Sequence, residues 1–137
     1  MNTWQVKRLI LLITFGAGSS LISNGAATDA ALFDAENGGV WAISPGYMVH
    51  QGELHDLIDL FRNPGSASKQ GIVVDGKNYM CIQADDKFIY GRMNMTGIVC
   101  AKTDKLIILA YYDENKMPGE TALAVEKTAD KFRELGY

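Results

Sequence analysis

The strongest pattern of apolar and polar positions lies in GELHDLIDLFRNPG, residues 52–65. Its apolar side chains recur at i, i+3, i+4 and i+7, at Leu54, Leu57, Ile58 and Phe61. This spacing places them on one face of a helix. The closing Asn-Pro-Gly ends the helix, because proline cannot continue it and glycine favours its end. The stretch therefore predicts an amphipathic helix with one buried side.

Shorter apolar runs predict strands. Residues 27–33 alternate small or apolar with polar side chains, and the turn-forming AENGG separates them from VWAI at 40–43. This arrangement predicts a β-hairpin. From Gly71 onward, turn-forming residues separate five β-rich runs, which are GIVV, YMCIQ, FIYG, GIVCA and LIILAYY. We expect these five runs to form an antiparallel meander.

A final helix is predicted after the loop DENKMPGE. Its apolar side is formed at helical spacing by Ala122, Val125, Ala129 and Phe132. Leu123 and Lys127 point away from that side. Together these elements predict a single α+β domain over residues 1–137, with a central antiparallel sheet of about six or seven strands and helices from both chain ends.

The opening run VKRLILLITFGAGSSLI, residues 6–22, is open to three interpretations. A basic pair, then apolar residues, then small residues is typical of an export signal, which would be cleaved near Ser19 or Ala27. The second interpretation is a lengthened amphipathic first helix that packs LILLI against the sheet. The third is an error in the gene model. We favour these two over the export signal. The run is too short to span a bilayer. Residues 1–25 are the atypical part of the domain under each interpretation.

The composition of the chain excludes several classes of function. The chain has 137 residues and a formal charge of −3, so its surface as a whole does not attract nucleic acid. Two cysteines, Cys81 and Cys100, are too few for a disulfide framework, and we expect both to be reduced. No zinc-binding spacing, cofactor motif or nucleophile context is present, so no catalytic residue, metal site or cofactor is expected. A binding module is the remaining class.

Aromatic residues gather at the two ends of the sequence. These are Trp4 near the start, Phe132 and Tyr137 at the close, and Trp41 between them. Chain ends usually fray, so large rings there indicate that the ends dock together. A cleft lined by Trp and Tyr suits a polyproline II ligand. The alternative is that these rings only fill the core between the helices and the sheet.

A local basic group stands out on this acidic chain. It consists of Lys87, Arg92, Lys102 and Lys105, in or beside the strands of the meander. Clustered cations on a sheet suit an acidic protein surface or anionic lipid head groups. The alternative is an ordinary sheet edge that carries lysines to prevent strand pairing.

Several stretches, in order, resemble the profilin family. They are TWQ at 3–5, ALFDAENGGVWAISPGY around Trp41, QADDKFIYGR, AKTDKLIILAYYDE, MPGE and VEKTADKFRELGY. The resemblance covers nearly all of residues 27–137. It implies a sheet with the two terminal helices on one face and a short helix on the other.

The resemblance also implies partners. It implies a cytoplasmic, cytoskeletal protein that binds actin monomers, regulates actin polymerisation and binds proline-rich ligands, with phosphoinositides bound through the basic residues Lys87, Arg92, Lys102 and Lys105. The implied polyproline groove is formed by Trp4, Trp41, Phe132 and Tyr137. The implied actin face contains Arg92 and Lys102 and is bordered by Cys81, Leu123 and Lys127. The leader interpretation keeps a rival function open, a small secreted or surface-exposed domain without actin binding.

The chain departs from the family pattern at three positions. Profilins usually read Trp-Gln-x-Tyr-x-Asp near the start, whereas this chain has Lys7 in place of the groove tyrosine. Lys131 replaces a further ring in the last helix, and Met93 stands where a second basic residue is common. Aromatic contacts supply most of the energy of such a groove, so we expect weaker proline binding.

Overall fold

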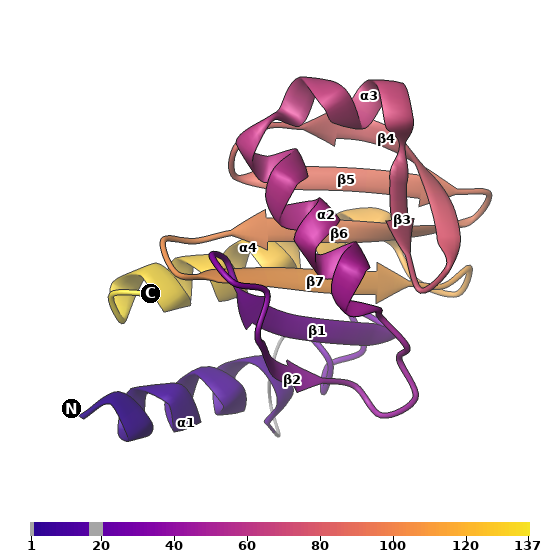
Figure 1. The fold of residues 1–137 in the computed structure, drawn as a ribbon. Coiled ribbons are helices and arrows are strands. Elements are labelled where there is room, and N and C mark those ends of the chain that lie inside the picture. The colour runs from indigo at the N-terminus through magenta and orange to yellow at the C-terminus, as the bar shows by residue number, and fades with distance from the viewer. Residues whose placement is uncertain (1, 17–20) are drawn as a thin grey trace.

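The computed structural model describes residues 2–16 and 21–137. Its strands form one antiparallel sheet in the order β2-β1-β7-β6-β5-β4-β3 (Figure 1). The strands are β1 (Asp29–Asp34), β2 (Val40–Ile43), β3 (Ile72–Val74), β4 (Lys77–Ala84), β5 (Phe88–Met93), β6 (Thr96–Lys102) and β7 (Leu106–Tyr112). The hairpin and the five-stranded meander predicted from the sequence are thus confirmed, and so is the α+β class.

The central strands are apolar on both faces. In β1, Ala31 and Phe33 belong to one buried cluster, and Ala30 and Leu32 belong to a second cluster on the opposite face. β6 and β7 alternate in the same way. Successive side chains of a strand point to opposite faces, so a strand buried on both sides reads as a continuous apolar run. Both faces of the sheet therefore need a cover.

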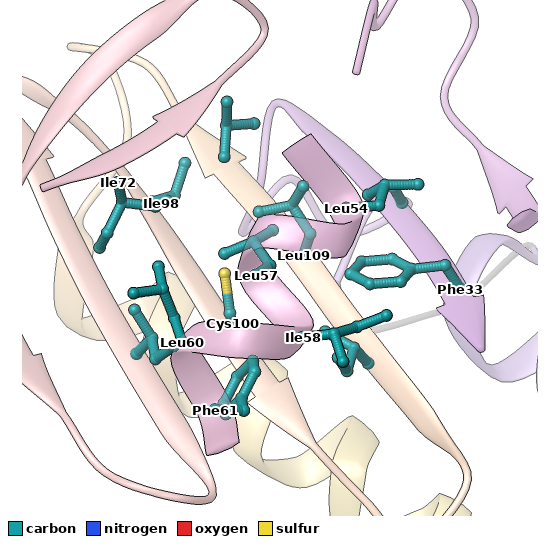
Figure 2. Packing of buried hydrophobic residues seen from close by; sticks show 14 of the residues in the cluster. Phe33, Leu54, Leu57, Ile58, Leu60, Phe61, Ile72, Ile98, Cys100 and Leu109 are labelled. Atoms are coloured by element: carbon teal, nitrogen blue, oxygen red, sulfur yellow. The ribbon is translucent and has the colours of Figure 1, made fainter. Parts of the chain in front are cut away.

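One face is covered by α2 (Gln51–Arg62), which crosses in front of the sheet in Figure 1. Its predicted apolar residues Leu54, Leu57, Ile58 and Phe61 are all buried. They pack toward the sheet around the buried Cys100, as Figure 2 shows. A 3₁₀ turn, η1 (Pro64–Ser66), and the single turn α3 (Ala67–Gln70) follow α2, so the helix ends where the Asn-Pro-Gly predicts.

A buried carboxylate fastens the start of α2. Glu53 accepts hydrogen bonds from the backbone N–H groups of His50 at 2.9 Å, Asp75 at 2.8 Å and Gly76 at 2.9 Å. Three donors replace the water that this carboxylate loses on burial. The bonds tie the helix to the β3–β4 turn, where Asp75 and Gly76 both have positive φ.

The opposite face is covered by α4 (Pro118–Glu134) and α1 (Thr3–Phe15). Val125, Ala129 and Phe132 of α4 are buried as predicted, whereas Ala122 is only half-buried. The helix is rotated so that Thr121 faces the sheet and donates its hydroxyl hydrogen bond to the Ala26 carbonyl. The sequence pattern missed this because a threonine was not counted as a core residue.

Residues 6–15 of the opening run belong to the helix α1, which packs against the sheet. Its N-cap Asn2 exchanges hydrogen bonds with Gln5, which completes a capping box. Ile10 and Thr14 are fully buried, but Leu12 is 54 % exposed, so the predicted packing of LILLI holds fully only for Ile10. Residues 17–20, which include the suggested cleavage position Ser19, lie outside the described residues.

Replacing Gly97 by alanine should destabilise the fold. Gly97 lies opposite Tyr112 in the β6–β7 ladder, and an added Cβ would overlap the Tyr112 hydroxyl and lie 2.6 Å from the Gly91 carbonyl oxygen. We expect the free energy of unfolding in urea to fall by about 1–3 kcal/mol. The matched control is Gly52→Ala in α2, where no atom lies within 4 Å, and where alanine should add up to about 1 kcal/mol. Equal stability of the Gly97→Ala variant and the parent chain would contradict this packing.

Candidate functional site

Two aromatic rings from distant parts of the chain meet at one end of the sheet. The centroid of the Trp41 ring, on β2, lies 5.8 Å from that of Tyr137, the last residue, and the rings are inclined at 70°. Both side chains are half-buried. This edge-to-face pair is a favourable aromatic arrangement that still leaves ring surface accessible.

The backbone of Tyr137 is held in place by three hydrogen bonds. Its carbonyl oxygen accepts from the Thr103 hydroxyl at 2.6 Å and from the Lys105 N–H at 2.9 Å, and its own N–H donates to the Phe132 carbonyl at 2.9 Å. Gly136 has φ +85°, a conformation that lets the chain turn back after the helix. The C-terminus is therefore docked on the β6–β7 turn rather than frayed.

The helix α1 brings one cation over this pair and carries one further ring with a cation of its own. Lys7 Nζ lies 4.9 Å from the centre of the Trp41 ring, and the Arg8 guanidinium carbon lies 5.8 Å from that of Trp4. Trp4 is 67 % exposed and precedes Lys7 by one helical turn, so it lies on the same side of α1 as the contact with Trp41. Both chain ends lie on the same side of the molecule in Figure 1, and α1 contacts α4.

The sequence prediction for Phe132 is corrected. Its side chain is fully buried in the cluster between α4 and the sheet, among residues such as Ile108 and Val125. It supports the groove from below and offers no ring surface to a ligand. We call the remaining set, Trp4, Trp41 and Tyr137, the aromatic groove.

A hollow of about 570 Å³ adjoins the aromatic groove. Trp41 and Tyr137 line it. Its cations are Arg62, Lys102 and Lys105, and its carboxylates are those of Asp34, Glu36 and Asp104. Lys105 Nζ lies 4.7 Å from the centre of the Tyr137 ring. The hollow thus combines two rings with three charges of each sign.

A second surface lies on the outer strands of the sheet, on the side of α4. Arg92 on β5 is exposed, and it faces Met80 of β4 across the ladder. A hollow of about 330 Å³ is lined there by Arg92, Ile82 and residues of the first turns of α4. Met80 is 66 % exposed and Ile82 is 58 % exposed. We call this the outer-strand surface.

A hydrogen bond joins this surface to α4. The Tyr90 hydroxyl donates to Glu126 Oε1 at 2.9 Å. Burial, and then this hydrogen bond and the charge of Glu126, raise the pKa of Tyr90 to about 12, so the phenol stays protonated as a donor at neutral pH. Leu123 and Lys127 lie on the exposed side of α4, as the sequence predicts, and Leu123 is 51 % exposed.

Two residues expected on the face of Arg92 lie elsewhere. Cys81 packs, half-buried, on the cluster under α2, on the opposite face of the sheet, and burial raises the pKa of its thiol. Lys102 shares the side of β6 that carries Ile98 and Cys100, also under α2. It also lies five residues beyond Gly97, the partner of Arg92, which corresponds to about 16 Å along the strand.

The predicted basic group is split by this topology. Lys87, Lys102 and Lys105 lie in or beside the β4–β5 and β6–β7 turns, at the end of the sheet where Tyr137 docks, and the Lys102 N–H donates to the Lys87 carbonyl at 2.8 Å. Arg92 lies at the opposite end. Sequence reasoning missed Met80 and Ile82, although the alternation of YMCIQ already places them opposite Tyr79 and Cys81.

Within residues 2–16 and 21–137, no group of three or more His, Cys, Asp or Glu side chains is placed to hold a metal ion. In the same part of the chain, no helix is both long and apolar enough to cross a membrane. Both cysteines are free.

Comparison with known proteins identifies the family. The family model described as Profilin matches residues 17–137. Profilin-1 of Dictyostelium discoideum is 36 % identical over 116 residues, which are 85 % of this chain and 92 % of the relative. Profilin-2 of the same organism is 42 % identical over 112 residues, 82 % of this chain and 88 % of the relative.

Solved structures agree with this result. The crystal structure of Acanthamoeba castellanii profilin II superposes with a TM-score of 0.84 at 31 % identity and covers 90 % of this chain and 98 % of its own. Mouse profilin IIa, solved in complex with a double repeat from the FH1 domain of mDia1, has the same fold, with a TM-score of 0.67 at 14 % identity over 85 % of this chain and 93 % of its own. Profilins are non-enzymatic, actin-binding proteins of the cytoplasm and cytoskeleton. The sequence matches, the sheet and its helix cover all lead to one conclusion: this chain belongs to the profilin family.

Proposed function

We propose that this chain binds proline-rich segments in the aromatic groove. The observation that carries the proposal is the contact between Trp41 and Tyr137, two half-exposed rings held together by the docked C-terminus. Proline rings of a polyproline II helix stack on such surfaces. In the described part of the chain neither the Trp41 indole N–H nor the Tyr137 hydroxyl has a hydrogen-bond partner, so both are free to meet ligand carbonyls. The mouse neighbour solved with an FH1 double repeat supports this ligand class.

The second part of the proposal is that an actin monomer binds the outer-strand surface and that this binding regulates polymerisation. Exposed Met80 and Ile82 form an apolar centre beside the guanidinium of Arg92. Exposed apolar side chains with a charged rim are typical of a protein interface, and methionine adapts to a partner's shape. Leu123 and Lys127 extend the surface along α4.

The two surfaces are separate. The aromatic groove lies where the chain ends dock, at the end of the sheet where β7 begins, whereas Arg92 lies where β6 begins. A proline-rich segment and an actin monomer therefore do not compete for the same residues. This separation supports a role in which the protein delivers a bound monomer to a proline-rich partner.

Binding of phosphoinositides is a third component of the proposal, at the hollow beside the aromatic groove. Arg62, Lys102 and Lys105 line this hollow together, so a multiply charged head group would meet three cations there, beside the carboxylates of Asp34, Glu36 and Asp104. Arg92 lies at the opposite end of the sheet and is left out of this site.

Removing either ring of the Trp41–Tyr137 pair should strongly weaken binding to polyproline. We expect Trp41→Ala, or deletion of Tyr137, to lower affinity for a ten-residue proline peptide at least about tenfold, because central Trp and Tyr contacts dominate such interfaces. Retention on immobilised polyproline measures this. Leu123→Ala, an exposed apolar residue on the far side of α4, is the matched control and should bind as the parent chain does. Unchanged retention of the Trp41→Ala chain would contradict the groove.

Reversing the charge of Arg92 should weaken actin binding. We expect Arg92→Glu to lower affinity for monomeric actin about tenfold or more while polyproline retention stays intact, because the variant places a like or unpaired charge inside one interface only. Fluorescence anisotropy of labelled monomer measures the affinity. Lys102→Glu, the same change on the opposite face, should alter it less than twofold. A larger effect of Lys102→Glu than of Arg92→Glu would restore Lys102 to the actin face.

Removing two lysine charges from the hollow should weaken binding of the chain to phosphoinositide vesicles. We expect the double substitution Lys102→Gln and Lys105→Gln to lower vesicle binding about ten- to thirtyfold, at about 1 kcal/mol for each lost cation. Co-sedimentation with vesicles that contain a phosphoinositide measures this. The control is Arg92→Gln, which should retain binding. Equal loss in both variants would show that the charges act through the whole surface.

A further inference from the structure

Every ring of the aromatic groove carries a cation. Lys7 lies over Trp41 at 4.9 Å, Arg8 over Trp4 at 5.8 Å and Lys105 over Tyr137 at 4.7 Å. These distances lie within the range of cation–π attraction. A neutral proline ring that stacks on these faces must therefore share them with, or displace, a charged side chain.

In the described part of the chain these three cations have no carboxylate partner. Among the described residues the one ion pair joins Arg133 to Asp130 at 2.9 Å. Lys7, Arg8 and Lys105 belong to no pair, although the chain as a whole is acidic. Their charges are exposed to solvent and open to a ligand.

The two sides of the groove differ in charge. On the α1 side, residues 1–28 contain Lys7 and Arg8 and no Asp or Glu at all. On the other side, three acids line the hollow with Arg62, Lys102 and Lys105, so charge there is nearly balanced. The uncompensated positive charge therefore lies along α1, beside Trp4 and Trp41.

The stability of α1 does not explain this charge. Lys7 and Arg8 follow the first turn of α1 (Thr3–Phe15), too far from either helix end for the helix dipole to favour them, and no acidic residue stands in that first turn. Lys7 and Arg8 are both exposed, and their side chains form no hydrogen bond with any other described residue. A ligand with negative charge would compensate them.

We propose that the aromatic groove selects proline-rich segments that carry acidic residues at the end of the proline run lying along α1. This inference rests on the proposed proline binding and adds the class of ligand to it. Glutamate or aspartate next to the prolines would pair with Lys7 and Arg8 and draw these side chains off the rings, which frees the ring faces for stacking. Charge complementarity then replaces part of the stacking that a tyrosine at position 7 would supply.

The test compares peptides on the full chain. One peptide has ten prolines alone; the others carry two glutamates, or two lysines, at the N-terminal or the C-terminal end of the same run. Both tryptophans of the chain are groove residues, so tryptophan fluorescence reports binding directly. At low salt we expect one of the two glutamate peptides to bind about three- to tenfold more tightly than plain polyproline, and the matching lysine peptide to bind more weakly. The preference should disappear in about 0.5 M salt.

Variants assign the effect to α1. In Lys7→Gln with Arg8→Gln, the preference for glutamate should fall to less than twofold, while Lys69→Gln with Lys77→Gln, the same loss of two exposed charges away from α1, should retain it. Equal binding of all peptides would overturn this inference and leave proline binding standing. Absence of binding to every peptide would overturn proline binding itself and this inference with it. A third outcome is that the parent chain shows no peptide preference and the variant of Lys7 and Arg8 no longer binds anionic vesicles. That outcome would assign the charge of α1 to a membrane surface and would also overturn this inference.

Discussion

The arrangement of the molecule depends on the central strands being apolar on both faces. β1, β6 and β7 bury side chains in two separate clusters, and neither face tolerates water. Burial of apolar surface is the main favourable contribution to folding, so each face requires a helix. α2 covers one face, and the two terminal helices share the other (Figure 1). The chain ends meet because only together do they cover that face.

Both proposed binding surfaces lie where the helices stop covering the sheet. α4 crosses the central strands and leaves the outer strands β4 and β5 partly bare, which exposes Met80 and Ile82. At the border of this cover, Trp41 of the edge strand β2 and Tyr137 at the chain end contact each other and stay half-exposed. The fold thus places apolar surface at two separated positions without opening the core.

Much of the fold was predictable because it rests on short-range patterns. The helix over residues 51–62, the hairpin and the meander are each encoded within a dozen residues, by periodicity and turn chemistry. The aromatic pair was also predictable, since rings at chain ends indicate docking. The register of the strands and the rotation of α4 about its own axis were harder to predict from the sequence. Periodicity placed Phe132 on the buried side of the last helix, as the structure has it, and only the resemblance and its place near the chain end put it in the groove. Ala122 was placed in the core although Thr121 takes that position, because a helical stripe can be turned by one residue without a change in its pattern.

The expectation that Arg92 and Lys102 share one face is wrong for a related reason. Lys102 and Arg92 lie on neighbouring strands and look equivalent in the sequence, but the two ends of an antiparallel ladder are far apart, and alternation sends the two side chains to opposite faces. Cys81 differs from Met80 only by one step along β4, and that step reverses its face. A site on a sheet is defined by register, and a shift of one residue exchanges the surface for the core.

The resemblance places Lys7 where profilins usually carry a groove tyrosine, and the structure shows what surrounds this lysine. From the sequence alone it is a lost ring, and it indicates a weaker groove. In the structure the lysine lies over Trp41, and its neighbour Arg8 lies over Trp4, so the position contributes charge where it no longer contributes stacking. Contacts between exposed charges are weaker than aromatic burial and are screened by salt, but they discriminate between ligands of opposite charge. Under the proposed selectivity, this position shifts the basis of recognition from the number of prolines toward the residues that flank them.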